Sequence, residues 1–203
     1  VGAEGVGAVG QRVIGAGAAG LAAGLALQGS GRSFVVLEAR DRVGGRAFTD
    51  TETLGLVPRR DKLCLVQLSG GDGNAHLVQL DRSSYDAPNL KALFTNPAIT
   101  KIFHYARFDV AVIKHYLGVD TGPLYCTKIA SKLTRTYTDR HGLKDVTKEL
   151  VGVDLSKAQQ SSDWGAARLS DDQVAYAASD VLHLHAIRAR LDEMLVREGR
   201  DAL

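Results

Sequence analysis

The chain has 203 residues, of which 45% are hydrophobic and 24% are charged, so it is long enough for one or two domains with a real core. Two cysteines exclude a disulfide scaffold, and glycines interrupt the longest uncharged stretch, so we expect no membrane span. A net charge of +2 gives weak bulk attraction to nucleic acid, which means that phosphate binding would have to be local.

The first segment is rich in glycine and predicts a strand, a tight turn, a helix and a second strand over residues 12–38. Its turn reads G-x-G-x-x-G, with Gly15, Gly17 and Gly20. In a dinucleotide-binding unit such glycines let the backbone approach a pyrophosphate, and an acidic residue about 20 positions on holds a ribose hydroxyl. Glu38 is the residue at that spacing.

The continuation at 38–46 resembles the stretch that follows the FAD fingerprint in flavin amine oxidases, and the similarity covers residues 12–49. Such an enzyme needs several hundred further residues to enclose the flavin, and a lone βαβ fragment cannot bury its apolar faces. We therefore expect residues 1–46 to form an incomplete Rossmann-like segment that binds no FAD. We interpret the chain as a fusion, natural or from sequence assembly, whose join lies within 48–55.

From residue 50 onward the pattern alternates between strands and helices. Strands are predicted at 62–68 and 75–80, joined by a hairpin turn of Gly, Asp and Asn, and at 100–104. The predicted helices are 107–117, 127–134, 143–151 and one long helix that runs from a capping box at 170–173 toward Arg197. This alternation predicts an α/β domain over 47–203.

Four carboxylates and one tyrosine are the candidates for chemistry. Asp50 and Glu52 lie two apart at the end of a predicted strand, so both project from one face. Asp180 lies four residues after Tyr176 on the long helix, which puts these two side chains on one helical face. If Asp109 joined them, four carboxylates could not all stay ionised at close range without cations. Two Mg²⁺ or Mn²⁺ ions would balance that charge and suit phosphoryl displacement.

Three motifs in this order resemble those of the ribonuclease D type of exonuclease, in the DEDD superfamily with tyrosine in the third motif. The motifs are DTET at 50–53, HYARFD at 104–109 and YAASD at 176–180, and the similarity covers essentially all of 50–203. The stretches at 126–137 and 159–164 are most similar to the compact members called nanoRNase C, which degrade very short RNAs, notably dinucleotides.

The resemblance implies a ribonuclease H-like exonuclease fold, in which helices flank a mixed sheet, and a metal-dependent 3′-5′ exoribonuclease that yields nucleoside 5′-monophosphates. It implies that Asp50, Glu52 and Asp180 bind the metal ion that activates water. It implies that Asp50 and Asp109 support a second ion near the leaving group, and that Tyr176 positions the nucleophile. In the family the first motif ends a buried strand, so residues 47–49 must supply that strand here.

The same resemblance implies two substrate contacts. Leu54 matches the apolar residue that packs against the terminal base, and His104 matches the histidine that opens the second motif. Ribonuclease D proteins commonly carry asparagine after that histidine, and this sequence departs from them with Tyr105.

A group of basic residues offers a further substrate contact. Lys128, Lys132 and Arg135 lie on one face of the predicted helix, which suits either a ridge that contacts phosphates or an ordinary solvated face.

Two alternatives to the enzyme remain open from the sequence. One is an FAD-binding fragment of a flavoprotein, and the other is an inert nucleic-acid-binding module in which the replaced first strand misplaces Asp50. For the enzyme we expect short RNA as the partner, with DNA as the alternative. We also expect cytoplasmic localisation, and the resemblance implies an octameric ring of identical copies.

Overall fold

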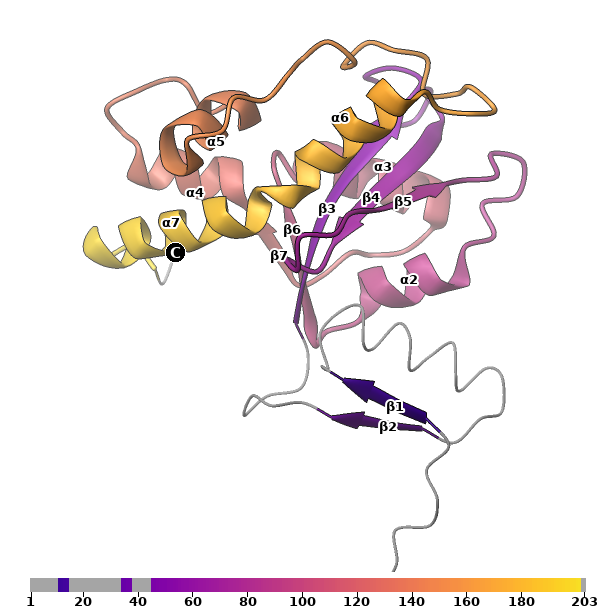
Figure 1. Ribbon diagram of the computed structural model, residues 1–203, viewed down its shortest axis with the longest axis horizontal. Coiled ribbons are helices and arrows are strands. Elements are labelled where there is room, and N and C mark those ends of the chain that lie inside the picture. The colour runs from indigo at the N-terminus through magenta and orange to yellow at the C-terminus, as the bar shows by residue number, and fades with distance from the viewer. Residues whose placement is uncertain (1–10, 15–33, 38–44, 202–203) are drawn as a thin grey trace, which may run out of the picture.

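The structure, a computed structural model, describes residues 11–14, 34–37 and 45–201 (Figure 1). Two short strands, β1 (Gln11–Ile14) and β2 (Phe34–Leu37), pair in parallel in a sheet of their own. Parallel neighbours need a crossover connection, so this pairing suits the Rossmann-like segment that the sequence predicts. The expected helix at 21–28 and the candidate FAD-binding residues Gly15, Gly17, Gly20 and Glu38 lie outside the described residues.

The second sheet has five strands in the order β5-β4-β3-β6-β7. Its strands are β3 (Gly45–Thr53), β4 (Leu63–Ser69), β5 (His76–Gln79), β6 (Ile99–Phe103) and β7 (Leu124–Cys126). The pairs β3·β4 and β4·β5 are antiparallel, whereas β3·β6 and β6·β7 are parallel. The predicted hairpin and the expected mixed sheet are therefore confirmed.

The central strand is β3, which carries the first motif. Ala47, Phe48 and Thr49 are all buried, with 3% or less of each side chain exposed. Asp50 lies opposite Gln67 of β4 in the antiparallel register. Residues 47–49 thus supply the buried strand that the exonuclease fold needs, because apolar and β-branched side chains suit a strand covered on both faces.

Six helices lie around this sheet in the described part of the chain. They are α2 (Pro88–Thr95), α3 (Arg107–Leu117), α4 (Thr127–Thr134), α5 (Leu143–Val151), α6 (Asp171–Leu182) and α7 (Leu184–Arg197). The helices expected at 107–117, 127–134 and 143–151 are confirmed to the residue. Sequence reasoning missed α2, although Pro88 at its first turn is a helix-start signal. It also missed β7, which is only three residues long.

The expectation of one long C-terminal helix is wrong. The capping box is present, since Gln173 N donates to Ser170 Oγ and Ser170 N donates to Gln173 Oε1. However, the helix ends before His183, and α7 begins after it. His185 Nδ1 lies 2.8 Å from the Leu182 carbonyl oxygen and satisfies it at the end of α6. The break lets α6 pack on β3 and β4 while α7 packs on α4 and α5 (Figure 1).

Three hydrophobic clusters of buried residues pack around the sheet in the described part of the chain, and the smallest contains Trp164 and Ala177. Phe94 of α2, Val112 of α3 and Phe103 of β6 belong to one cluster. Phe48 of β3, together with residues of α4, α5, α6 and α7, belongs to another, whose centre includes Ile187. The resulting layers fix β3 from both sides. Within the described ranges, no helix has the length and apolarity needed to cross a membrane.

Candidate metal and active site

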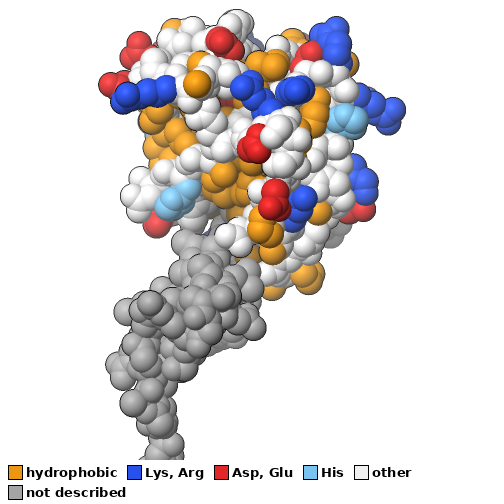
Figure 2. All heavy atoms as spheres, turned by 90° about the vertical axis from the view of Figure 1, so that its right-hand side faces the viewer, with side chains coloured by type: hydrophobic (Ala, Val, Ile, Leu, Met, Phe, Trp, Pro, Cys, Tyr) orange, Lys and Arg blue, Asp and Glu red, His pale blue; other side chains and the backbone are white. Residues whose placement is uncertain are grey.

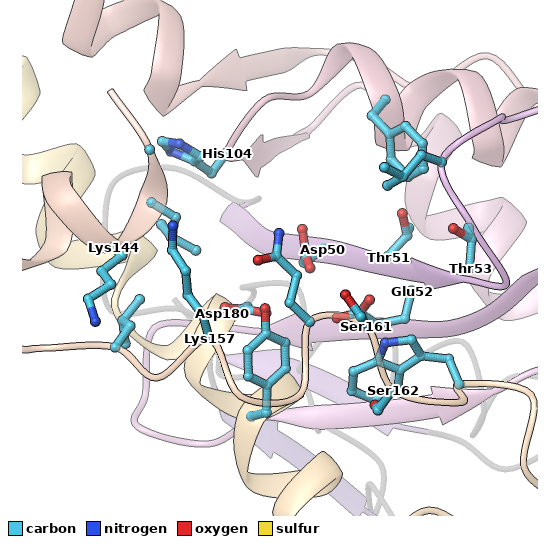
Figure 3. Close-up of a pocket in the computed structure, with 18 of the residues that line it drawn as sticks. Asp50, Thr51, Glu52, Thr53, His104, Lys144, Lys157, Ser161, Ser162 and Asp180 are labelled. Atoms are coloured by element: carbon cyan, nitrogen blue, oxygen red, sulfur yellow. The ribbon is translucent and has the colours of Figure 1, made fainter. Parts of the chain in front are cut away.

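Three of the predicted carboxylates converge in the structure. Asp50 and Glu52 come from β3, where residues two apart share a face, and Asp180 comes from α6, which packs against β3. Each carboxylate offers an oxygen, and these oxygens all lie within 4.8 Å of one another (Figure 3). The three acids therefore form one compact group of oxygen donors.

The fourth carboxylate, Asp109, lies beside this group rather than in it. It comes from the first turn of α3 and is buried, with 3% exposed. Thr51 Oγ1 donates a hydrogen bond of 2.7 Å to Asp109 Oδ1. Burial raises the pKa of Asp109, and the negative charge of Asp50 raises it further. Asp109 is thus within electrostatic reach of the group and is held in place by β3.

Burial and mutual repulsion make these carboxylates hold protons when no cation is present. Burial raises the pKa of Asp50 to about 7. Burial and the neighbouring carboxylates raise the pKa of Asp180 to about 8 and that of Glu52 to about 10. A site built this way favours divalent cations, which offset the repulsion, and its all-oxygen donor set fits Mg²⁺ or Mn²⁺ rather than softer metals.

Tyr176 lies one helical turn before Asp180 on α6, and its hydroxyl interacts with the Asp180 carboxylate. Burial and the surrounding carboxylates raise the pKa of the Tyr176 hydroxyl. The hydroxyl therefore stays protonated near neutral pH and can both donate and accept a hydrogen bond at the edge of the carboxylate group.

Gln67 is a neighbour of the site that sequence reasoning missed. This side chain is fully buried in β4, and its Nε2 lies 3.4 Å from Glu52 Oε1. Because it donates to one oxygen of Glu52, it restricts how that carboxylate turns. Gln67 could have been predicted as a neighbour of Glu52 only from the register between β3 and β4, since no local motif marks this residue.

The carboxylates lie in the wall of an elongated cavity of about 560 Å³. His104, Lys144 and Lys157 lie at one end, and Thr53 and Ser162 lie at the other, with Asp50 between them (Figure 3). Lys128 also lines the cavity. The cavity therefore combines an acidic centre with a basic end, and lysines at such an end suit contacts to phosphate groups.

The two substrate contacts implied by the resemblance both line this cavity. Leu54 is 49% exposed there. His104 is held through both ring nitrogens, by Thr127 Oγ1 at 2.9 Å and by the His141 carbonyl at 3.0 Å. Burial lowers the pKa of His104 to about 4, so its ring is uncharged at neutral pH.

The structure does not bring Lys132 and Arg135 to the cavity. Lys132 is exposed elsewhere on α4. The Arg135 side chain is fully buried, where it donates to Ser131 Oγ at 2.9 Å, to the Arg140 carbonyl at 2.7 Å and to the Glu149 carboxylate. The expected substrate contact of Arg135 is therefore wrong, because its donors serve the fold, and Lys128 is the member of the predicted ridge that reaches the cavity.

Residues of the segment 155–164 form one wall of the cavity. The loop that follows is held by hydrogen bonds from side chains more than 80 residues away in the chain. Arg82 Nη2 donates to the Gly165 carbonyl at 2.8 Å, and Gln79 Nε2 donates to the Ala166 carbonyl at 2.7 Å. A Cβ at Gly165 would lie 2.5 Å from Arg82 Nη1 and 2.7 Å from Leu54 Cδ2. A side chain at position 165 would therefore displace the ends of the Arg82 and Leu54 side chains.

The charge on the face shown in Figure 2 is mixed. Among its described residues, Lys and Arg side chains alternate with Asp and Glu side chains rather than form one basic surface. This pattern agrees with the small net charge of +2.

The family described as 3′-5′ exonuclease matches residues 47–196. A second family, described as NAD(P)-binding Rossmann-like domain, matches residues 13–65. The two matches overlap over 47–65, which the structure places in β3, the connection after it and the start of β4.

Ribonuclease D of Acidiphilium cryptum is 36% identical to this chain over 162 residues, which cover 79% of the chain and 41% of the relative. The chain thus spans about two fifths of the length of that curated relative. NrnC of Brucella melitensis is similar in structure. With bound Mg²⁺ it has 54% identity and a TM-score of 0.74, and the match covers 77% of this chain and 76% of that one. Bound to pGG it has 55% identity and a TM-score of 0.75 at the same coverage.

Proposed function

The chain belongs to the 3′-5′ exonuclease family, and from this premise we propose that it hydrolyses the 3′-terminal phosphodiester of short oligoribonucleotides and releases nucleoside 5′-monophosphates. The observation that carries the proposal is the convergence of Asp50, Glu52 and Asp180 at the centre of a cavity that has one basic end. Single acids of this kind are common, whereas a group of three, with Asp180 buried and Asp50 and Glu52 half-buried, beside a protonated tyrosine suits phosphoryl transfer.

Asp50, Glu52 and Asp180 would hold one divalent ion, and Asp50 with Asp109 would support a second. Two ions held there supply the positive charge that stabilises both the attacking and the leaving oxygen of an in-line displacement. Thr51 keeps Asp109 next to Asp50, and Gln67 restrains Glu52, so the protein fixes its donors before substrate arrives.

Tyr176 orients the attacking water through its hydroxyl, which Asp180 holds at the edge of the carboxylate group. The water oxygen forms a bond to the phosphorus of the terminal phosphodiester, and the bond from that phosphorus to the 3′ oxygen breaks. The 3′ oxygen takes up a proton and remains on the shortened RNA, while the phosphate leaves on the released nucleotide.

Short RNA is the substrate class that the cavity and the relatives support best. The basic end suits the phosphate on the 5′ side of the scissile bond, and a cavity of about 560 Å³ suits few nucleotides. The Brucella melitensis relative is bound to the dinucleotide pGG in one structure, which supports a preference for very short substrates.

We also propose that residues 47–203 form the exonuclease domain and that 1–46 form a separate partial Rossmann-like segment. The described strand β3 begins at Gly45, close to this boundary. The expected octameric ring and the cytoplasmic localisation stay predictions; light scattering of the full chain would test the first of them.

An exonuclease assay tests the proposed function. Full chain would be incubated with labelled RNA of two and of seven nucleotides, and with the matching DNA, in Mg²⁺ and in EDTA. We expect mononucleotide release from RNA only in Mg²⁺, and loss of release in Asp50→Ala. Folded protein that releases no nucleotide under these conditions would leave the inert-module alternative in place.

A further inference from the structure

Tyr105 has a strained backbone next to His104, a residue that lines the cavity. Its φ is +68°, in the left-handed region that a bulky side chain rarely adopts. Its side chain is 49% exposed, so burial repays little of this cost. Strained residues persist at functional sites when the local geometry serves binding or catalysis. The residue before it, His104, lines the cavity.

A lysine fixes the Tyr105 ring in relation to the cavity. Lys128 Nζ lies 4.2 Å from the centroid of the ring, within the range of a cation–π contact. Lys128 itself lines the cavity, so one side chain contacts both the ring and the space where substrate binds. An exposed aromatic ring beside a cation is the combination that proteins use to bind single-stranded nucleic acid.

The residue before Tyr105 lies at the end of the cavity opposite to Thr53, since His104 and Thr53 lie on opposite sides of Asp50 in Figure 3. Leu54, which follows Thr53 in the chain, also lines the cavity. A strand whose terminal base contacts Leu54 and whose scissile phosphate lies at Asp50 therefore continues toward His104 and Lys128, and Lys128 contacts the Tyr105 ring.

From this geometry we propose that Tyr105 binds the nucleobase on the 5′ side of the scissile bond by stacking, with Lys128 beside the adjoining phosphate. The ligand class is an unpaired nucleobase, and the contact is sequence-tolerant because every base presents a π-face. This proposal rests on the proposed function, whose substrate site it extends by one nucleotide.

The decisive variant is Tyr105→Asn, because asparagine adopts the left-handed conformation more readily than tyrosine. We expect this variant to melt no lower than wild type, so a loss of binding cannot be ascribed to misfolding. Its dissociation constant for a labelled dinucleotide, measured in Ca²⁺ to limit hydrolysis, should rise about 5-fold to 150-fold, the range expected for loss of one base–aromatic stack.

Tyr137→Asn is the matched control. Tyr137 is also exposed, at 68%, with the Arg135 guanidinium 5.9 Å from its ring centroid. Neither tyrosine lines the cavity itself, but the partner of Tyr105, Lys128, does, whereas Arg135 is buried away from it. Its replacement should leave the dissociation constant unchanged. Tyr105→Phe keeps the ring and should retain most of the affinity.

An abasic substrate separates stacking from other roles of Tyr105. A dinucleotide with an abasic ribose on the 5′ side should bind wild type as weakly as the normal dinucleotide binds Tyr105→Asn, and the variant should no longer distinguish the two substrates. The proposal would be overturned if removal of the 5′ base weakened binding equally in wild type and in Tyr105→Asn. An unchanged dissociation constant in Tyr105→Asn would overturn it as well. Absence of mononucleotide release by wild type in Mg²⁺ would instead contradict the proposed function, since the binding comparison stands without turnover.

Discussion

Thr51 Oγ1 and Asp109 Oδ1, 58 residues apart in the chain, are joined by a hydrogen bond of 2.7 Å. The bond connects the central strand β3 to the first turn of α3. Because both residues are buried, the hydroxyl decides how Asp109 faces Asp50. A threonine between two acidic residues thereby becomes part of the support of the carboxylate group.

Replacement of Thr51 by valine removes this bond at almost constant volume. We expect nuclease activity to fall about 10-fold to 100-fold, as for other groups that orient metal-binding carboxylates. The control is Thr49→Val, because Thr49 is equally buried in β3 but donates only to the Ala47 carbonyl, at 3.3 Å. Initial rates in Mg²⁺ check the prediction, and equal losses in both variants would show that strand packing is responsible.

Replacement of Asp180 by asparagine should lower activity and raise stability. Activity should drop more than about 100-fold, since a metal-binding oxygen is lost. In EDTA the same change removes a carboxyl group whose ionised form is disfavoured by burial and by the charge of Asp50. Tm near neutral pH should therefore rise by roughly 3 °C for each kcal/mol of this cost. Calorimetry in EDTA measures the second effect. A Tm below that of wild type in EDTA would mean that the three acids do not repel one another in the metal-free protein.

The metal-free protein should lose stability as pH rises. Asp50 and Asp180 have folded-state pKa values of about 7 and about 8, above their ordinary value of 3.8. A folded state with raised pKa binds more protons than the unfolded chain, so this contribution is complete in acid and declines between about pH 4 and pH 8. Saturating Mg²⁺ should abolish the decline, because the cation takes the place of the protons.

Melting temperatures across this pH range, with EDTA and with Mg²⁺, check that expectation. Asp50→Asn should flatten the curve in EDTA. If Tm depended on pH in the same way in EDTA and in Mg²⁺, the proposed replacement of protons by the cation would be contradicted.

Replacement of Arg135 by methionine should act on stability rather than on RNA binding. The change leaves Ser131 Oγ and the Arg140 carbonyl without the buried guanidinium that donates to them and should cost about 1 to 3 kcal/mol of folding free energy. Lys128→Met, by contrast, should weaken RNA binding and lower its salt dependence while Tm stays near that of wild type. Urea unfolding and RNA titrations at two salt concentrations separate the two variants. A fall in RNA affinity for Arg135→Met at unchanged stability would restore the predicted ridge.

Local sequence was sufficient for much of the fold. Helices α3, α4 and α5 have apolar residues at helical spacing, and Gly118 and Gly152 adopt left-handed conformations immediately after α3 and α5. The break at His183 was not predictable in this way, because neither glycine nor proline marks it. Packing of α6 on the sheet and of α7 on α4 and α5 decides it.

The sequence by itself determined two local faces, since two-residue spacing on a strand places Asp50 with Glu52 and four-residue spacing on a helix places Tyr176 with Asp180. That these two faces meet followed from the resemblance of the motifs to those of the ribonuclease D type. Only the tertiary structure decided which neighbours serve these acids. Helix α4 directs Lys128 into the cavity, whereas Arg135, directly after its last residue, lies in the core. A side chain's surroundings depend on elements far away in the chain, and helical periodicity alone cannot say which of them cover it.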